Sequence, residues 1–79
     1  MAPTIFRQDA FRFFFFSREE TRMHVHVSHP DGEAKFWLEP QLELATSQGL
    51  KAKQLAYIVQ LITARRMEID DAWRKHFSC

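Results

Sequence analysis

Two short segments with alternating apolar and polar residues lie on either side of a turn, and they constrain the fold more than any other part of the chain. In residues 23–28 Met, Val and Val alternate with His, His and Ser, and in 34–39 Ala, Phe and Leu alternate with Lys, Trp and Glu. Pro30, Asp31 and Gly32 lie between them, and Asp-Gly is a strong signal for a two-residue hairpin loop. Because side chains alternate between the faces of a strand, the pattern predicts a β-hairpin with one buried face.

Placing Asp31 and Gly32 at the turn also predicts the register of this hairpin. The expected cross-strand pairs are Val27 with Phe36, Val25 with Leu38, His26 with Trp37, Ser28 with Lys35, and His24 with Glu39. A slip of one residue would expose the valines and bury the histidines, so the alternation specifies the faces strongly.

The size and composition limit the class of protein. A chain of 79 residues forms one domain, here residues 1–79, and 46% apolar residues favour a folded core over disorder. Eleven Lys and Arg against ten Asp and Glu give no charge argument for nucleic acid beyond a local patch. The single cysteine, Cys79, excludes an internal disulfide, and no apolar run is long enough to span a membrane. We therefore expect a cytoplasmic protein without a cofactor.

Further strands are expected before and after the hairpin, all within residues 4–46. A short strand at 4–8 and a tight connection at 9–10 lead into a second strand at 11–17, which is apolar on both faces and therefore central. Pro40 ends the hairpin, and the alternation of Leu42 and Leu44 suggests an edge strand, with a helical turn as the alternative.

The period changes to that of a helix over residues 51–77. The residues expected on its apolar face are Leu55, Ile58, Val59, Ile62, Ile69, Trp73 and Phe77. A straight helix of this length would measure roughly 40 Å, whereas a chain of this size is roughly 30 Å across. Either the helix bends near residues 64–66, where the apolar stripe is interrupted, or its end packs on another chain. We favour one long, slightly bent helix.

The expected architecture is therefore α+β. It consists of a mainly antiparallel β-meander of four to five strands with one long C-terminal helix packed on one face. In this arrangement His24, His26, Lys35 and Trp37 share the side of the sheet turned away from the helix.

His24 and His26 form the candidate site, because alternate residues of a strand point to the same side. The two rings could bind one metal ion if a third ligand were present, and Glu39 or Glu19 could supply it. Alternatively the two rings could act as general base and general acid in the cleavage of RNA without a metal. In that case Lys35 would stabilise charge on the phosphate, and Trp37 would stack on a base.

In a simpler interpretation, this face of the sheet has neither a catalytic nor a metal-binding role. His-X-His is a short pattern that occurs often without function. Phe14, Phe16 and Trp37 would form an apolar patch on the face that the helix leaves open, and Glu39 would border it. An exposed apolar patch favours a homodimer or a bound partner protein.

Several motifs together resemble a known family. They are Pro3-Thr4-Ile5, Phe13 to Ser17, His24-Val25-His26-Val27, Ala34-Lys35-Phe36-Trp37-Leu38-Glu39-Pro40, Gly49-Leu50, and Trp73 with Phe77. The chain resembles, nearly end to end, the small bacterial proteins of the domain of unknown function 4160 family. It departs from the family pattern at Arg22, Met23 and Lys51, which concern a loop and a helix cap.

Members of this family often lie beside a small partner gene in arrangements like toxin–antitoxin pairs, so the resemblance implies such a setting for this chain. It supplies no catalytic residues that could be carried over to this sequence. We therefore expect a protein that binds a cognate partner, or a second copy of itself, through its open sheet face. A ribonuclease that uses His24 and His26, and a histidine-based metal-binding module, are the alternatives.

Overall fold

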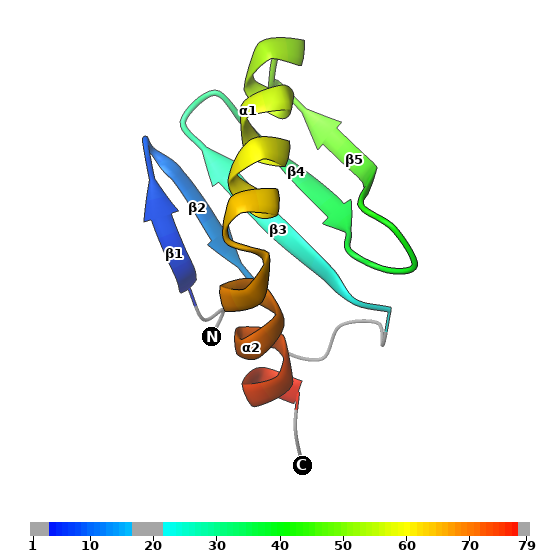
Figure 1. Cartoon of the computed structure of the whole chain (residues 1–79). Coiled ribbons are helices and arrows are strands. Elements are labelled where there is room, and N and C mark those ends of the chain that lie inside the picture. Colours follow the sequence, from blue (N-terminus) through cyan, green and yellow to red (C-terminus); the bar gives the residue numbers. More distant parts are fainter. Residues whose placement is uncertain (1–3, 17–21, 78–79) are drawn as a thin grey trace.

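The chain forms a five-stranded antiparallel sheet covered by two helices. The computed structural model describes residues 4–16 and 22–77. The strands are β1 (Thr4–Gln8), β2 (Phe11–Phe14), β3 (His24–His29), β4 (Gly32–Trp37) and β5 (Glu43–Gln48). They follow one another in the sheet in chain order, β1-β2-β3-β4-β5, so the predicted α+β meander is confirmed (Figure 1).

The first hairpin has the tight connection that the sequence predicts. Asp9 and Ala10 join β1 to β2 with φ angles of 52° and 69°. Positive φ at both loop residues matches the right-handed twist of the flanking strands, as in the two-residue turns typical of hairpins. β2 ends at Phe14, earlier than the expected end at residue 17, and Ser17 lies outside the described residues.

The central hairpin has the predicted faces but a different register. Val25 pairs with Phe36 and Val27 with Ala34, so the expected pairs are wrong by two residues. The loop consists of Pro30 and Asp31, whereas Gly32 is already the first residue of β4. A shift of two residues preserves the side to which each residue points, so the valines and the phenylalanine still lie beneath the helices.

The close approach of the neighbouring strand leaves no space for a side chain at Gly32. A Cβ atom on Gly32 would lie 2.0 Å from the carbonyl oxygen of Gln48, the last residue of β5. Only glycine permits this approach. The glycine that suggests a turn in the sequence therefore serves the contact between β4 and β5.

The edge strand β5 starts and ends later than expected. It runs to Gln48, beyond the predicted limit at residue 46, and Leu42 lies before it. The peptide bond between Glu39 and Pro40 is cis. Ala45 has no partner in β4, because the register shifts between the pairs of Thr46 and Leu44. This bulge interrupts the alternation of apolar and polar residues. The sequence therefore shows the alternation only in the part before Ala45.

The helical segment lies where the sequence predicts it, but it is divided into two helices rather than forming one long, slightly bent helix. α1 (Ala52–Ala64) and α2 (Arg66–Phe77) are separated at Arg65, within the segment where the apolar stripe is interrupted. Arg65 lies over the ring of Phe6, 3.7 Å from its centroid, and its guanidinium also binds Glu68. Val59, expected on the apolar face, is 37% exposed. Neither helix of the described chain combines the length and the apolar character needed to cross a bilayer.

The core lies between the sheet and the helices. Its fully buried large side chains are Phe13, Phe15, Val25, Val27, Leu38, Ile58, Ile62 and Ile69, together with His24. Each such aliphatic or aromatic side chain contributes roughly 1.5–3 kcal/mol when it is removed from water.

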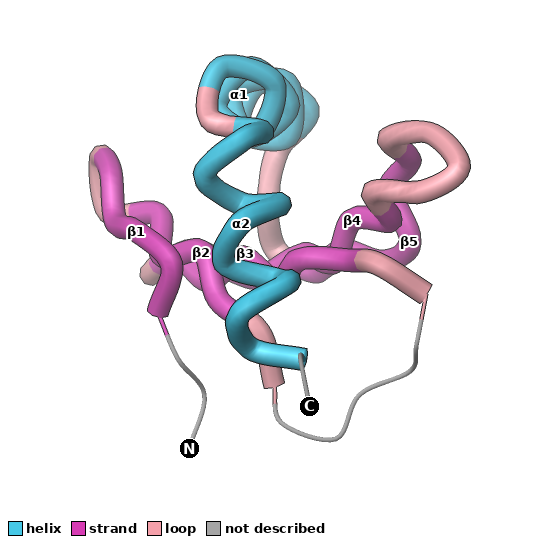
Figure 2. Tube along the Cα trace, turned by 60° about the horizontal axis from the view of Figure 1, so that its bottom comes forward, coloured by secondary structure: helices cyan, strands magenta, loops and turns pink. Residues whose placement is uncertain are grey.

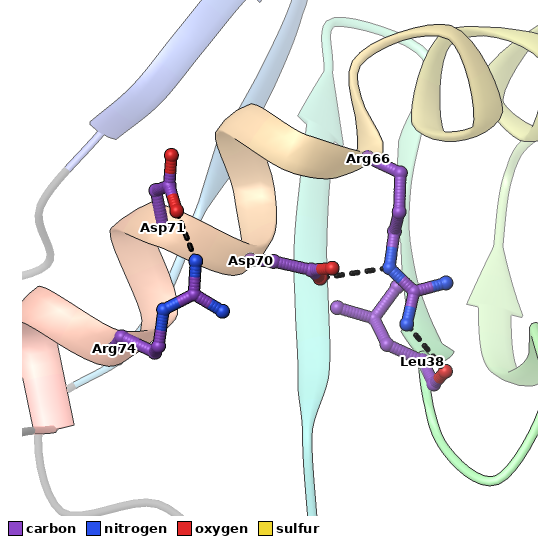
Figure 3. A network of polar contacts seen from close by, with 5 residues as sticks. All are labelled: Leu38, Arg66, Asp70, Asp71 and Arg74. Carbon is purple, nitrogen blue, oxygen red and sulfur yellow. Dashed lines mark hydrogen bonds and ion pairs between the residues drawn. The ribbon is translucent and has the colours of Figure 1, made fainter.

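A polar contact fixes the first turn of α2 to the end of β4. The Nε atom of Arg66 donates a hydrogen bond to Asp70, and its Nη2 atom donates one to the carbonyl oxygen of Leu38, at 2.8 and 2.9 Å (Figure 3). Leu38 directly follows β4. The pair of Asp71 and Arg74 in the same view lies within the exposed surface of α2.

We expect Arg66→Met to lower the free energy of unfolding by about 1 kcal/mol, because the Leu38 carbonyl loses a charge-assisted partner. The side chain is 35% exposed, so solvent screens part of the interaction. Arg74→Met is the matched control, with a loss below about 0.5 kcal/mol for an exposed pair within one helix. Urea unfolding measures both, and equal losses would show that Arg66 does not anchor α2.

Tyr57 links α1 to the turn between β1 and β2. Its hydroxyl donates a hydrogen bond to the carboxylate of Asp9. This bond raises the pKa of Tyr57 above its ordinary value of 10.0, and partial burial and the charge of Asp9 act in the same direction. The raised pKa means that the fold favours the neutral phenol. The stabilisation is therefore complete below pH 10.0 and is lost as pH rises through the folded-state pKa.

Tyr57 is the sole tyrosine, so the ultraviolet absorbance of tyrosinate reports its titration directly. We expect a titration midpoint above 10.0 in the folded protein, and a lower one in Asp9→Asn, where the charged acceptor is gone. The same protein unfolded in urea provides the reference. A midpoint at or below that reference in the folded chain would contradict the contact.

Candidate functional site

The side of the sheet turned away from α1 is called the open face here. Figure 2 shows α1 over one side of the sheet, with α2 continuing from it toward the end of the sheet. Val25, Val27 and Phe36 point toward the helices and are at most 2% exposed. The residues that alternate with them in β3 and β4 therefore form the centre of the open face.

Cross-strand pairing arranges the open face in three rows. The middle row is Thr4, Phe14, His26, Lys35 and Thr46. The row nearer the β3–β4 turn is Arg7, Arg12, Ser28, Glu33 and Gln48. The third row is His24, Trp37 and Glu43. Residues directly opposite each other point to the same side, so each row is a line of potential contacts.

His26 lies at the centre of an aromatic cluster. Its ring centroid is 5.5 Å from that of Phe14 and 4.5 Å from that of Phe16, which follows β2. Phe14 is 8% exposed, whereas Phe16 is 45% exposed. The structure therefore brings both predicted phenylalanines to the histidine side of the sheet, but only Phe16 presents its ring to solvent.

Trp37 carries two cations close to its ring. The guanidinium carbon of Arg22 lies 4.2 Å from the ring centroid and the Nζ atom of Lys35 lies 4.3 Å from it. Such contacts are attractive because the face of the indole is electron-rich. Trp37 pairs with His24 rather than with the expected His26, whose neighbour in β4 is Lys35.

A third cation covers Phe14. The guanidinium carbon of Arg12 lies 4.4 Å from the centroid of the Phe14 ring, and the Nε atom of Arg12 donates a hydrogen bond to Thr4 at 2.7 Å. Arginine over an aromatic ring thus occurs at both ends of the open face. The two arginines are separated by His26 and Lys35 in the middle row.

Cations outnumber carboxylates on the open face. Among the described residues of the three rows and of the Trp37 contact, the cations are Arg7, Arg12, Arg22 and Lys35, and the carboxylates are Glu33 and Glu43. Glu43 already pairs with Arg22 at 3.3 Å. This part of the surface is therefore positive although the whole chain has a formal net charge of only +1.

His24 does not lie on an exposed surface, contrary to our expectation that both histidines would. Its ring is 0% exposed, and its Nδ1 atom lies 2.6 Å from the carbonyl oxygen of Arg22, a distance at which Nδ1–H donates. Trp73 of α2 contacts it at a centroid distance of 5.3 Å and also contacts Phe15, the residue after β2. The pairing of β2 with β3 ends at His26, so no residue of β2 pairs with His24. Trp73 of α2 can therefore contact the imidazole of His24.

The two imidazoles are neighbours, with ring centroids 5.1 Å apart. Of these two residues, only His26 is partly exposed to solvent, since His24 is fully enclosed. An acid–base pair acting on RNA requires that both rings reach the substrate. In this arrangement only one imidazole of the pair can reach a substrate, whereas the ribonuclease hypothesis requires both.

The metal hypothesis meets a similar obstacle. Glu39 was expected opposite His24, but Trp37 occupies that position. Within residues 4–16 and 22–77 there is no group of three or more His, Cys, Asp or Glu that could hold a metal ion. Glu19, the other candidate ligand, lies outside the described residues.

A shallow hollow of about 470 Å³ lies over the middle of the open face. Its lining consists of Phe16, His26, Glu33, Ala34, Lys35, Thr46, Ser47 and Gln48. It contains an exposed aromatic ring, a cation and hydrogen-bonding side chains within one surface, which is the mixture found in binding sites rather than in cores.

Sequence reasoning missed the arginines of this site. Arg12 has a readable signal, because it is two residues from Phe14 in the same strand and must share its side. Arg22 has none, since it precedes β3 and reaches Trp37 from outside the strand.

We expect the two histidines to differ in stability. His24→Ala removes a buried ring and a hydrogen bond and should cost about 2–4 kcal/mol of unfolding free energy. His26→Ala removes a half-buried ring and should cost about 1 kcal/mol. Urea unfolding of both variants measures the difference, and equal small losses would show that His24 is not part of the core.

Comparison with known proteins gives one result. The model of a family described as "Domain of unknown function (DUF4160)" matches residues 10–74 of this chain. No curated protein and no solved structure gives a match. The match includes β2 to β5, α1 and most of α2, and thus the histidine strand and the residues that surround it. The chain therefore belongs to the family known as domain of unknown function 4160.

Proposed function

We propose that this chain is a binding protein that docks one partner protein on its open face, as one half of a toxin–antitoxin-like pair. The observation that carries the proposal is the combination of an exposed Phe16 with Trp37 and three cations on a sheet face away from α1. Aromatic residues and arginine are the side chains most enriched at the energetic centres of protein interfaces.

The charges of the open face favour a partner with an acidic surface. Lys35 pairs with His26 on one side, and Arg12 covers Phe14, which pairs with His26 on the other. Glu33 is the carboxylate of the adjoining row. Complementary charges raise the association rate and select against wrong partners more than they raise the affinity. The apolar part of the binding energy would come from Phe16 and from the hollow beside it.

The alternatives have less support. The ribonuclease hypothesis requires His24 at a surface, but its ring is fully enclosed. The metal-binding hypothesis requires a third ligand, and the described residues supply none near the two histidines. Docking on the open face requires neither.

The test is co-expression of the chain with the product of the neighbouring gene, followed by size-exclusion chromatography and calorimetry. We expect a stable complex whose affinity falls at least about thirtyfold in the double variant Phe16→Glu, Lys35→Glu, a loss typical of hot-spot residues. Met67→Glu is the matched control, because Met67 is 81% exposed on α2, away from the open face.

The affinity should also fall as salt concentration rises, because exposed charges are screened. Thermal unfolding of each variant checks that the fold is kept. A strictly monomeric chain that forms no complex would overturn the proposal, as would a complex that the open-face variant leaves intact. Cleavage of RNA by the pure chain, lost in His26→Ala, would favour the enzyme instead.

A further inference from the structure

The outer edge of β5 has hydrogen-bonding groups available for another strand. Among the described strands, β5 pairs only with β4, and it is the last strand of the sheet (Figure 1). In a strand at an edge, alternate residues direct their N–H and C=O groups away from the sheet. Natural edges are often protected by lysine or proline, but residues 43–48 contain neither. The charge of Glu43 and the bulge at Ala45 are the protecting features within this strand.

An apolar groove lies between this edge strand and α1. It has a volume of about 240 Å³, with Phe36 of β4 at its floor. Leu44 forms one rim and Val59 the other, and these two side chains are 42% and 37% exposed. Leu42, Leu55 and Ala56 complete the apolar lining, and Glu43 adds the one charge. Exposed aliphatic residues thus lie on both sides of a groove next to an available edge.

The dimensions favour a peptide segment over other occupants. Pockets for drug-sized molecules measure roughly 300–1,000 Å³, so this groove suits a single large apolar side chain better. Six residues at about 3.4 Å each give an edge of about 20 Å. A contact of that length buries far less than the roughly 1,200–2,000 Å² of a stable protein pair, so it is too small for a homodimer.

Self-pairing of β5 also leaves the groove without an anchor. The antiparallel register that pairs all six residues of β5 with a second copy places Leu44 opposite Ser47 of that copy. Serine is too small and too polar to occupy the space between Leu44 and Val59. The occupant must therefore carry a large aliphatic or aromatic residue at this position.

We propose that β5 accepts an extended segment of another protein as a sixth strand, with one large apolar side chain anchored in the groove between β5 and α1. Main-chain hydrogen bonds to the edge supply affinity, and the groove selects the side chain. This site is distinct from the open face, because Leu44 pairs with Phe36 and points to the helix side of the sheet.

The test uses random peptides displayed on phage and selected against the full chain. We expect the selected peptides to alternate large apolar residues with polar ones, and synthetic copies to bind in fluorescence anisotropy. Val59→Arg should weaken binding at least about tenfold, as should Leu44→Glu, because each places a charge at a rim of the groove. Met67→Arg and Lys35→Glu are the controls, and neither should alter the affinity.

Methylation of peptide backbone nitrogens gives a readout specific to strand addition. Methyl groups on one set of alternate amides should abolish binding, and those on the other set should leave it unchanged, since only one set faces β5. Thermal unfolding confirms that the variants are folded, so a loss of binding reports the site.

Five results would each overturn the proposal, and four of them concern the peptides. These four are the absence of any binding peptide, unchanged peptide affinity in Val59→Arg, peptide affinity that is insensitive to backbone methylation, and loss of peptide binding in Lys35→Glu. Concentration-dependent dimers in light scattering that disappear in Leu44→Glu would assign the edge to a second copy and also overturn it. Because the open-face variants and the groove variants are different, failure here leaves the proposed partner docking untouched, and the reverse also holds.

Discussion

Everything in this structure depends on the packing of the central hairpin against the helices. Val25, Val27 and Phe36 are at most 2% exposed, and Ile58 and Ile62 of α1 are 0% exposed. Because this face must be buried, the alternate residues of β3 and β4 have to point the other way. The apolar packing thereby determines which side chains form the open face, although the packed residues themselves do not lie on it.

The alternation in the sequence predicts the side of the sheet to which each residue points, but it does not predict the cross-strand pairs. Pairing His26 with Lys35, two positions from the expected partner Trp37, keeps every residue on its predicted side. The turn could not be placed, because the requirement for Gly32 comes from the carbonyl oxygen of Gln48 in another hairpin. Local turn propensity contains no information about such a contact. The bulge at Ala45 has the same origin, since only the paired strand shows it.

The burial of His24 shows a second limit of reading strands from sequence. A residue on the polar side of a strand can be covered by another element where the neighbouring strand ends. Here β2 ends at Phe14, and α2 places Trp73 against the imidazole. The helix is divided at Arg65, where Arg65 binds Gln8 at the end of β1 and Arg66 binds the carbonyl oxygen of Leu38 after β4. The interrupted apolar stripe indicated the position of the division, but these contacts between residues far apart in the chain leave no pattern in the sequence.

The two proposed binding surfaces differ chemically because the sheet separates them. Lys35 and Phe36 are adjacent in β4, yet one lies on the cationic open face and the other at the floor of the apolar groove. Period-two geometry makes this separation unavoidable, since neighbouring residues of a strand cannot share a face. A partner with acidic groups therefore has no favourable contact in the groove, which is almost entirely aliphatic. Conversely, an apolar peptide gains little over Lys35 and Arg12, whose charges would have to be desolvated. The strand that connects the two surfaces would thus also keep their proposed ligands apart.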